Sequence, residues 1–370
     1  MSFVSEFEKY DWEEVRMGLY SCNATDVERA LSAPRPQTDD FMALLSPAAE
    51  PYLEVMAQRA YALTRQRFGH TMQFFVPLYL SNLCANDCSY CGFSMSNKLR
   101  RKTLTTDEIE QECLAIKAMG FDSVLLVTGE HESKVGMDYF CDALPLIKRH
   151  FSYLAMEVQP LSEQNYSELR NYGLDAVLVY QETYNRSSYS RHHHKGKKTD
   201  FNWRLQTPDR LGKAGIDKIG LGALIGLDDW RIDSFFTACH LRYLQKNYWR
   251  TRYSLSFPRL RPCAGGLSDI RPMSDKQLVQ LLCAWRILDS ELELSLSTRE
   301  SPFLRDHLLP LGITSISAGS RTQPGGYASE DQALEQFEID DNRSPATMAE
   351  VVRAKGLQPV WTDWHPGFSR

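Results

Sequence analysis

The spacing of apolar positions along the chain changes near residue 70. In residues 1–70 apolar side chains recur at helical spacing. Pro47 and Pro51 lie near expected helix starts, and Gly69 lies at an expected stop. We therefore predict a helical N-terminal extension over residues 1–70.

From residue 74 onward, short runs of β-prone apolar residues alternate with helix-like stretches. Such strands are typical of a parallel sheet buried on both faces, and eight of these units are typical of a (β/α)8 barrel. The predicted strands are 74–82, 122–130, 154–160, 176–184, 218–227, 253–262, 292–300 and 315–320. The expected fold class is α/β, a TIM-type (β/α)8 barrel over residues 71–320 with a C-terminal tail, 321–370, as a candidate lid.

One helix between the strands is well marked. Thr105 followed three residues later by Glu108 is the signature of a capping box, and Gly120 is expected to end the helix. Cys113 falls on the apolar stripe of this helix, so we interpret it as a core residue.

Polar and charged residues gather where the predicted strands end. In a barrel these positions line one mouth, where active sites are found. For any single residue, ordinary solvation of a loop is the alternative. The candidates are Thr128, Gly129, Glu130, Glu157, Gln159, Gln181, Glu182, Arg259, Arg261 and Arg299.

Three cysteines follow the first predicted strand. Cys84, Cys88 and Cys91 have C-x3-C-x2-C spacing. A structural zinc site usually takes four N or S ligands, and no fourth is evident nearby. Three thiolates on a short loop suit a [4Fe–4S] cluster that leaves one iron open to a small molecule. Zinc or a purely structural cluster is the alternative.

The charge and composition of the chain mainly exclude certain classes of function. The 370 residues carry a formal charge of −5, which argues against a nucleic-acid partner. No apolar stretch is long enough to span a bilayer, and no signal-peptide pattern is present. We therefore expect no membrane association and a cytoplasmic location.

The cysteine motif, with Tyr90 before its last cysteine, resembles that of the radical S-adenosylmethionine (SAM) superfamily. In that superfamily the open iron binds SAM, and one electron from the cluster releases a 5′-deoxyadenosyl radical. Thr128-Gly129-Glu130 resembles the GGE motif at the SAM ammonium, with Thr in place of the first Gly. The cofactor-binding residues that the resemblance implies are Tyr90, Thr128, Gly129, Glu130, Glu157, Gln159, Gln181, Glu182, Gly220 and Gly222.

Longer stretches resemble the 2-iminoacetate synthase family, the tyrosine lyases of thiamine biosynthesis. They include "VPLYLSNLCANDCSYCGFSMSN", "RHHHKGKKTDFNWRLQTPDR" and "SLSTRESP", and the resemblance runs from residue 39 to 364. It implies that L-tyrosine is cleaved at Cα–Cβ to 2-iminoacetate (dehydroglycine) and p-cresol, while SAM becomes 5′-deoxyadenosine and methionine.

The same resemblance implies partners. A heterodimer with thiazole synthase and electrons from flavodoxin or ferredoxin are expected. The basic run "RHHHKGKK" (191–198) is interpreted as a mobile loop near the mouth that meets solvent, a reductant protein or the partner synthase.

A free amino acid needs a cation for its carboxylate, and arginine offers a bidentate fork. Arg299, which follows the seventh predicted strand, is the first choice for tyrosine binding. Arg259 and Arg261 are the second choices. For each of the three, an ion pair between loops is the alternative.

Two other functions stay open at this point. The tyrosine lyase of [FeFe]-hydrogenase cofactor maturation resembles this chain through the barrel, but that family holds a second cluster on C-terminal cysteines, and no cysteine follows Cys283 here. A non-catalytic metal-binding scaffold would keep the three cysteines without needing the polar strand ends.

The cysteine motif makes the first testable prediction. Anaerobically reconstituted protein should be brown and hold about four irons per chain. Replacing Cys84, Cys88 or Cys91 by Ala should bleach it, because each thiolate is expected to hold one iron. Iron and sulfide analysis with the visible spectrum checks this. Variants that stay brown and still cleave SAM would disprove the cluster assignment.

Overall fold

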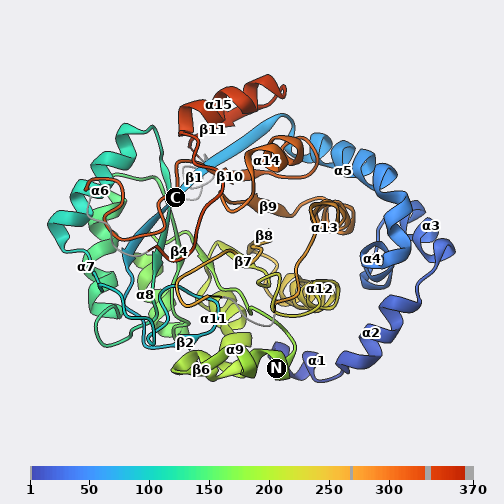
Figure 1. Ribbon diagram of the computed structural model, residues 1–370, viewed down its shortest axis with the longest axis horizontal. Coiled ribbons are helices and arrows are strands. Elements are labelled where there is room, and N and C mark those ends of the chain that lie inside the picture. The colour runs from blue at the N-terminus through green and yellow to red at the C-terminus, as the bar shows by residue number, and fades with distance from the viewer. Residues whose placement is uncertain (1, 267–269, 330–334, 363–370) are drawn as a thin grey trace.

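The computed structural model describes residues 2–266, 270–329 and 335–362, and within them parallel strands close into a barrel (Figure 1). Its eight strands are β1 (Thr71–Ser81), β3 (Ser123–Thr128), β4 (Tyr153–Glu157), β5 (Ala176–Leu178), β7 (Lys218–Leu221), β8 (Arg252–Ser256), β9 (Glu293–Leu296) and β10 (Ser315–Ser317). Each strand is bonded in parallel to the next in this order, and β10 pairs back with β1. The predicted (β/α)8 barrel is therefore confirmed.

The observed strands end earlier than the sequence predicts. The run 218–227, for example, is a strand only through Leu221. The apolar residues beyond it belong to loops that fold over the mouth, and Leu224 lines the pocket there. Apolar character alone does not separate a strand from such a buried loop.

Helices cover the outside of the barrel. They are α6 (Thr106–Ala118), α7 (Met137–Lys148), α8 (Glu163–Asn171), α11 (Thr207–Ala214), α12 (Trp230–Asn247), α13 (Asp275–Leu288) and α14 (Pro302–Leu308). The capping box of α6 is confirmed: the Glu108 carboxylate accepts the Thr105 N–H at 2.9 Å, and Cys113 is buried in the core.

The N-terminal extension is helical, as predicted. It consists of α1 (Phe3–Phe7), α2 (Trp12–Ser21), α3 (Ala24–Ser32), α4 (Thr38–Leu45), the 3-10 helix η1 (Pro47–Tyr52) and α5 (Leu53–Phe68). These helices run along the outer side of α12 and α13 (Figure 1). Phe41 packs on Trp285 with ring centroids 4.5 Å apart, and Phe7 packs on Phe236 at 5.2 Å. Aromatic burial therefore fixes the extension to the barrel.

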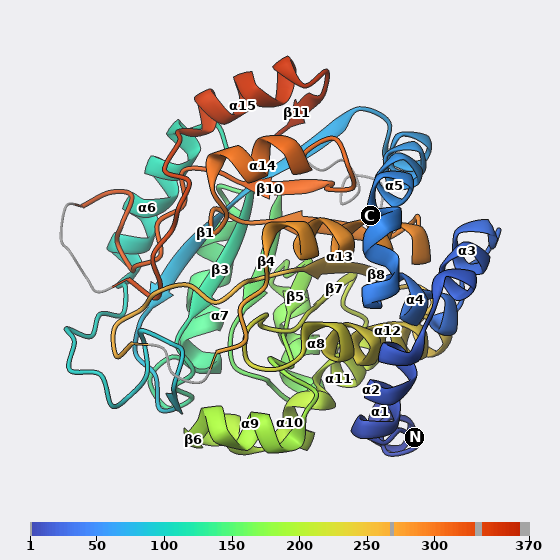
Figure 2. The same ribbon diagram turned by 45° about the vertical axis from the view of Figure 1, so that its right-hand side comes forward.

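Three short strands lie outside the sequence prediction. β2 (Asp87–Cys88) pairs antiparallel with β6 (His193–Lys195), and β11 (Gln358–Val360) pairs with the start of β1. Figure 2 shows β11 and α15 (Pro345–Ala354) beside the barrel next to β1 and β10. Strands of two or three residues are too short to show periodicity.

The division into 1–70, 71–320 and 321–370 stays a prediction. Residues 330–334 and 363–370 of the expected tail lie outside the described residues. Among the residues that the structure describes, no helix combines the length and apolar character that crossing a membrane requires.

A buried ion pair ties the C-terminal segment to α14 and makes a prediction. The side chains of Arg305 and Asp341 are 1% and 0% exposed and bonded to each other. Asp341→Ala should lower the free energy of unfolding by about 3–5 kcal/mol, because it leaves a buried guanidinium uncompensated. Chemical denaturation measures this. Lys9→Ala, in an exposed ion pair, is the control and should change stability by less than about 0.5 kcal/mol. Equal effects would contradict the prediction.

Candidate active site

A pocket opens at the carboxyl ends of the barrel strands and collects most of the residues predicted from the sequence. Loops after β1, β3, β4, β8 and β9 contribute to its lining. The predicted residues that line it are Cys84, Cys88, Tyr90, Cys91, Thr128, Gly129, Glu130, Glu157, Glu182, Arg261 and Arg299. The carboxyl mouth is where barrel enzymes carry their chemistry.

The three cysteines lie on one loop after β1 and open onto this pocket. Ser94 shapes the loop: its hydroxyl accepts the Cys88 N–H at 3.0 Å and donates to Asp87 at 2.6 Å. Within the described residues no three His, Cys, Asp or Glu side chains converge on one point, as the ligands of a single metal ion would. A [4Fe–4S] cluster has a separate iron for each thiolate, so three cysteines on one loop fit such a cluster.

Burial disfavours ionisation of these thiols. It raises the pKa of Cys84 to about 11 and places the pKa values of Cys88 and Cys91 above their ordinary range. A buried thiolate needs a nearby positive charge, which a metal centre supplies. The three thiols and their enclosure therefore fit an iron–sulfur cluster.

The histidine run holds the cysteine loop in place. Ser89 donates its backbone N–H to the His192 carbonyl at 3.1 Å, and the two side chains are bonded at 2.7 Å. The Nδ1–H of His193 donates to the Tyr189 carbonyl at 2.7 Å, so its Nε2 accepts the Tyr90 hydroxyl at 2.7 Å. Burial holds the pKa of His193 well below its ordinary value, which fits this neutral tautomer.

The basic run was therefore interpreted wrongly in part. His192, His193 and the Lys198 side chain are buried against the cysteine loop and the pocket rather than solvated. Helix α9 (Arg186–His192) presents His192 and strand β6 presents His193, and the pairing of β6 with β2 is a tertiary contact with no signal in the local sequence.

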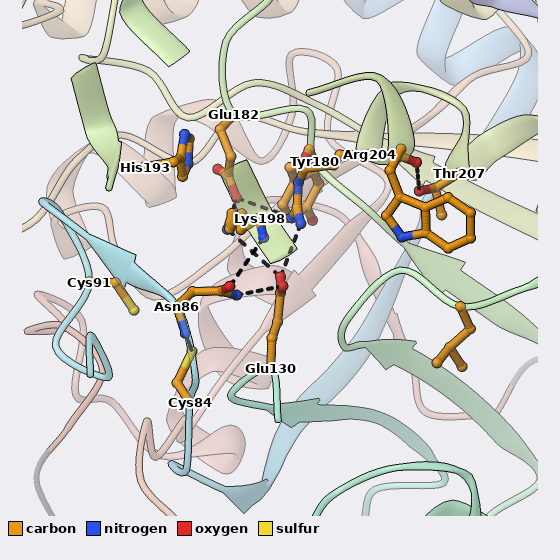
Figure 3. A network of polar contacts seen from close by, with 12 residues as sticks. Cys84, Asn86, Cys91, Glu130, Tyr180, Glu182, His193, Lys198, Arg204 and Thr207 are labelled. Atoms are coloured by element: carbon orange, nitrogen blue, oxygen red, sulfur yellow. Dashed lines mark hydrogen bonds and ion pairs between the residues drawn. The ribbon is translucent and has the colours of Figure 1, made fainter. Parts of the chain in front are cut away.

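Two carboxylates and two cations form a network beside the cysteines (Figure 3). Arg204 reaches Glu130 at 3.0 Å and Glu182 at 3.3 Å, and Lys198 reaches Glu182 at 2.7 Å. Asn86 donates to Glu130 at 2.7 Å. Burial opposes ionisation of Glu130 and Glu182, but the two cations outweigh it and lower both pKa values. Both carboxylates are therefore charged and already paired.

Three residues of this network were not predicted from the sequence: Asn86, Lys198 and Arg204. Asn86 lies between two cysteines, and Arg204 comes from the short helix α10 (Phe201–Leu205). Lys198 lies in the 3-10 turn η2 (Lys197–Thr199). The basic run was the available signal. Glu182 also adopts a φ of 71°, a left-handed conformation that is uncommon for a residue other than glycine.

Arg299 and Glu157 occupy the same pocket. The guanidinium carbon of Arg299 lies 3.5 Å from the centroid of the Phe337 ring, a cation–π contact. Burial is the main cause that raises the pKa of Glu157 to about 7, and Arg299 opposes it. Glu157 also interacts electrostatically with Lys198 and Arg204. It is therefore close enough to interact both with Arg299 and with the two cations of the network.

Some predicted residues do not line the pocket. They are Gln159, Gln181, Gly220, Gly222 and Arg259. Gln159 donates to the Val135 carbonyl at 2.7 Å, in a neighbouring cleft. The backbone N–H of Gln181 donates to Gly222 at 3.2 Å.

Gly220 of the fifth barrel strand, β7, and Gly222 just after it make room for pocket side chains. A Cβ on Gly220 would lie 2.4 Å from Leu178, and one on Gly222 would lie 3.0 Å from Tyr180. Both neighbours line the pocket. The glycines thus act on the site through these side chains, and their approach to the adenine stays a prediction.

The Arg259 guanidinium is already engaged. It is bonded to the Glu300 carboxylate and lies 2.8 Å from Asp275. The first contact joins two loops of the barrel mouth, and the second joins a loop to the first residue of α13. Both correspond to the ion-pair alternative. The structure therefore argues against Arg259 as a ligand of the substrate carboxylate and leaves Arg299 and Arg261.

Comparisons with known proteins agree with this site. Residues 78–239 match the Radical SAM superfamily, and residues 256–358 match the Biotin and Thiamin Synthesis associated domain. The chain is thus a radical SAM enzyme with a [4Fe–4S] cluster and SAM as its cofactors. It is 60% identical over 370 residues to the 2-iminoacetate synthases of Salmonella typhimurium and Escherichia coli, covering 100% of this chain and 98% of each relative. It belongs to the 2-iminoacetate synthase family and is a lyase.

Solved structures support the fold. A crystal structure of HydG, a maturase of the [FeFe]-hydrogenase, superposes with a TM-score of 0.91 at 30% identity, over 97% of this chain and 82% of that one. The structure of methylornithine synthase (PylB) superposes with a TM-score of 0.71 at 20% identity, over 90% of this chain and 97% of that one. The second likeness bears on the fold alone.

The raised pKa of Glu157 makes a prediction about pH. In the unfolded chain the Glu157 carboxyl has a pKa of about 4.3, which is lower than its pKa in the folded protein. The folded state therefore holds the proton more tightly. This stabilisation is complete below about pH 4 and is lost as the pH rises to about 7. Cluster-free wild type should therefore lose up to about 3 kcal/mol of unfolding free energy between about pH 5 and 8 relative to Glu157→Gln. Urea denaturation at several pH values measures the difference. Parallel pH profiles would contradict it.

Proposed function

We propose that this pocket binds L-tyrosine beside SAM and that the chain cleaves the Cα–Cβ bond of tyrosine. The products are 2-iminoacetate and p-cresol, and the first supplies the thiazole of thiamine. The observation that carries the proposal is that one pocket contains both the three-cysteine loop and a half-buried arginine, Arg299. Membership of the 2-iminoacetate synthase family supports it.

Arg299 is the proposed ligand of the tyrosine carboxylate. Its guanidinium packs on Phe337, and the oppositely charged neighbour Glu157 has a pKa near 7. Glu157 is therefore only partly ionised at neutral pH and leaves the cation available. A bidentate guanidinium–carboxylate pair would fix both the position and the orientation of the amino acid.

The wall near Arg299 suits an aromatic side chain. Phe75, Tyr79, Leu125, Tyr180 and Phe257 line the pocket. Stacked or edge-on rings would bind the phenol ring and exclude water from the bond that breaks. A radical on the departing 4-hydroxybenzyl group must take up one electron and one proton to become p-cresol, and the flavodoxin or ferredoxin proposed as reductant would supply that electron.

The cluster and SAM would be held by separate sets of side chains. Cys84, Cys88 and Cys91 would hold three irons, and the Glu130, Glu182, Lys198 and Arg204 network would bind the charged groups of SAM. When bound, this pair supplies the radical that removes a hydrogen atom from tyrosine. The chain's own residues orient both substrates: Lys198 or Arg204 is suited to a carboxylate, and Glu130 to an ammonium.

We also propose the partners and location that the resemblance implies. Thiazole synthase would receive 2-iminoacetate, and flavodoxin or ferredoxin would deliver the electron. A cytoplasmic setting is supported by the nine cysteines, all of which are free thiols in the structure.

An anaerobic assay with SAM, reductant and tyrosine tests the function. Wild type should form p-cresol and 5′-deoxyadenosine together. Arg299→Met should raise the KM for tyrosine about 10- to 100-fold, because a hydrogen-bonded charged contact is worth about 1.5–3 kcal/mol, while slow uncoupled 5′-deoxyadenosine formation persists.

Arg261→Met is the matched control. Arg261 lines the same pocket but also pairs with Asp340 at 3.6 Å, so its loss should have the smaller effect on KM. If Arg299→Met lost p-cresol and 5′-deoxyadenosine formation equally, Arg299 would have to be assigned to SAM binding instead of tyrosine binding. Absence of p-cresol from the wild-type reaction would overturn the proposed function.

A further inference from the structure

A C-terminal segment, residues 335–341, lies directly on the cysteine loop. Gly92 donates its backbone N–H to the Gln336 carbonyl at 3.0 Å, and the Gln336 N–H donates to the Thr322 carbonyl at 3.0 Å. A Cβ on Gly92 would lie 2.6 Å from the Gln336 carbonyl oxygen, so only glycine permits this approach. The segment is therefore fixed to the loop by its backbone.

The Gln336 side chain joins a pocket tyrosine to a cysteine. The Tyr79 hydroxyl donates to Oε1 of Gln336 at 2.7 Å, and Nε2 of Gln336 donates to the sulfur of Cys91 at 3.8 Å. A thiolate only accepts hydrogen bonds, and the tyrosine hydroxyl can donate. The carboxamide can therefore satisfy both neighbours in one orientation alone, with its N–H toward the sulfur.

Independent contacts fix this segment and an earlier part of the chain to the barrel. Within the segment, the backbone N–H groups of Asp340 and Asp341 donate to the Thr298 carbonyl at 3.0 Å and 3.1 Å. Upstream of the segment, the Glu112 carboxylate on α6 accepts the backbone N–H groups of Tyr327 at 3.0 Å and Ala328 at 2.6 Å. The Tyr327 hydroxyl donates to the Pro77 carbonyl at 2.8 Å. The residue after Gln336 is Phe337, whose ring covers the Arg299 guanidinium. One short piece of chain thus contacts both the cysteine loop and the substrate arginine.

We propose that Gln336 is a positioning residue that donates a hydrogen bond to the Cys91 ligand of the iron–sulfur cluster and so sets the cluster's reduction potential. The inference rests on the proposed function because it takes Cys91 as a cluster ligand. Reduction adds negative charge to the cluster and its sulfurs. An N–H directed at a ligand sulfur stabilises that charge and makes the potential less negative.

Redox titration of the reconstituted protein tests this inference, with the electron paramagnetic resonance signal of the reduced cluster as the readout. Gln336→Met keeps the length of the side chain and removes the N–H donor. Gln336→Glu places a carboxylate oxygen beside the sulfur. Both variants should keep wild-type iron content, and both midpoint potentials should become more negative, with the larger shift in Gln336→Glu. The control is Gln323→Met, which alters a half-buried glutamine of the C-terminal part outside the pocket lining and should not shift the potential.

Tyr79→Phe keeps Gln336 but removes the hydroxyl that orients its carboxamide. This variant should also make the midpoint potential more negative, but by a smaller amount. If the Gln336 variants do not take up the cluster, the potential of Tyr79→Phe is measured in their place. An unshifted potential in loaded Gln336→Met, or in loaded Tyr79→Phe when that variant carries the test, overturns the inference alone. A wild-type protein that holds no cluster overturns the proposed function and this inference with it.

Discussion

Three thiols gathered in one pocket, with Cys88 buried and Cys84 and Cys91 half-buried, are the constraint on which the rest of the site depends. Burial opposes their ionisation, so they act as thiolates only beside strong positive charge. Everything around the loop serves to hold it rigid and enclosed: the Ser94 hydroxyl bonded to Cys88, the histidines behind Ser89 and Tyr90, and the C-terminal segment over Gly92. A rigid, enclosed ligand set is what an iron centre with one open position requires.

Charge around the pocket is arranged in two groups. Glu130 and Glu182 are balanced by Lys198 and Arg204, so each of these charges costs less to bury than it would without its partners. Arg299 packs on an aromatic ring and interacts electrostatically with Glu182 of this network. Glu157 interacts with both groups, which explains why its ionisation depends on the balance of the whole pocket. One cavity can thus offer separate positions to two zwitterionic amino acids, SAM and tyrosine.

Different parts of the chain contribute to the site in different ways. Barrel strands place the loops, and the N-terminal helices bury their aromatic residues on α12 and α13 without lining the pocket. The part after β10 contributes Gln336 and Phe337 to the pocket and also adds β11 to the sheet. A segment anchored at several points can hold a side chain against a metal ligand more accurately than a free tail could.

The sequence by itself determined the barrel, its helical extension, the cysteine loop and eleven of the residues that line the pocket. Strands and helices can be predicted because their apolar residues recur at a characteristic spacing. The spacing of the three cysteines likewise indicates the kind of cluster that they bind. Only the tertiary structure decided that Arg259 is held by Glu300, that the histidine run supports the cysteine loop, and that Arg204 and Gln336 belong to the site. The physical reason is that these roles arise from contacts between residues far apart in the chain. A charged or amide side chain has the same local signature whether it faces solvent or a partner about a hundred residues away.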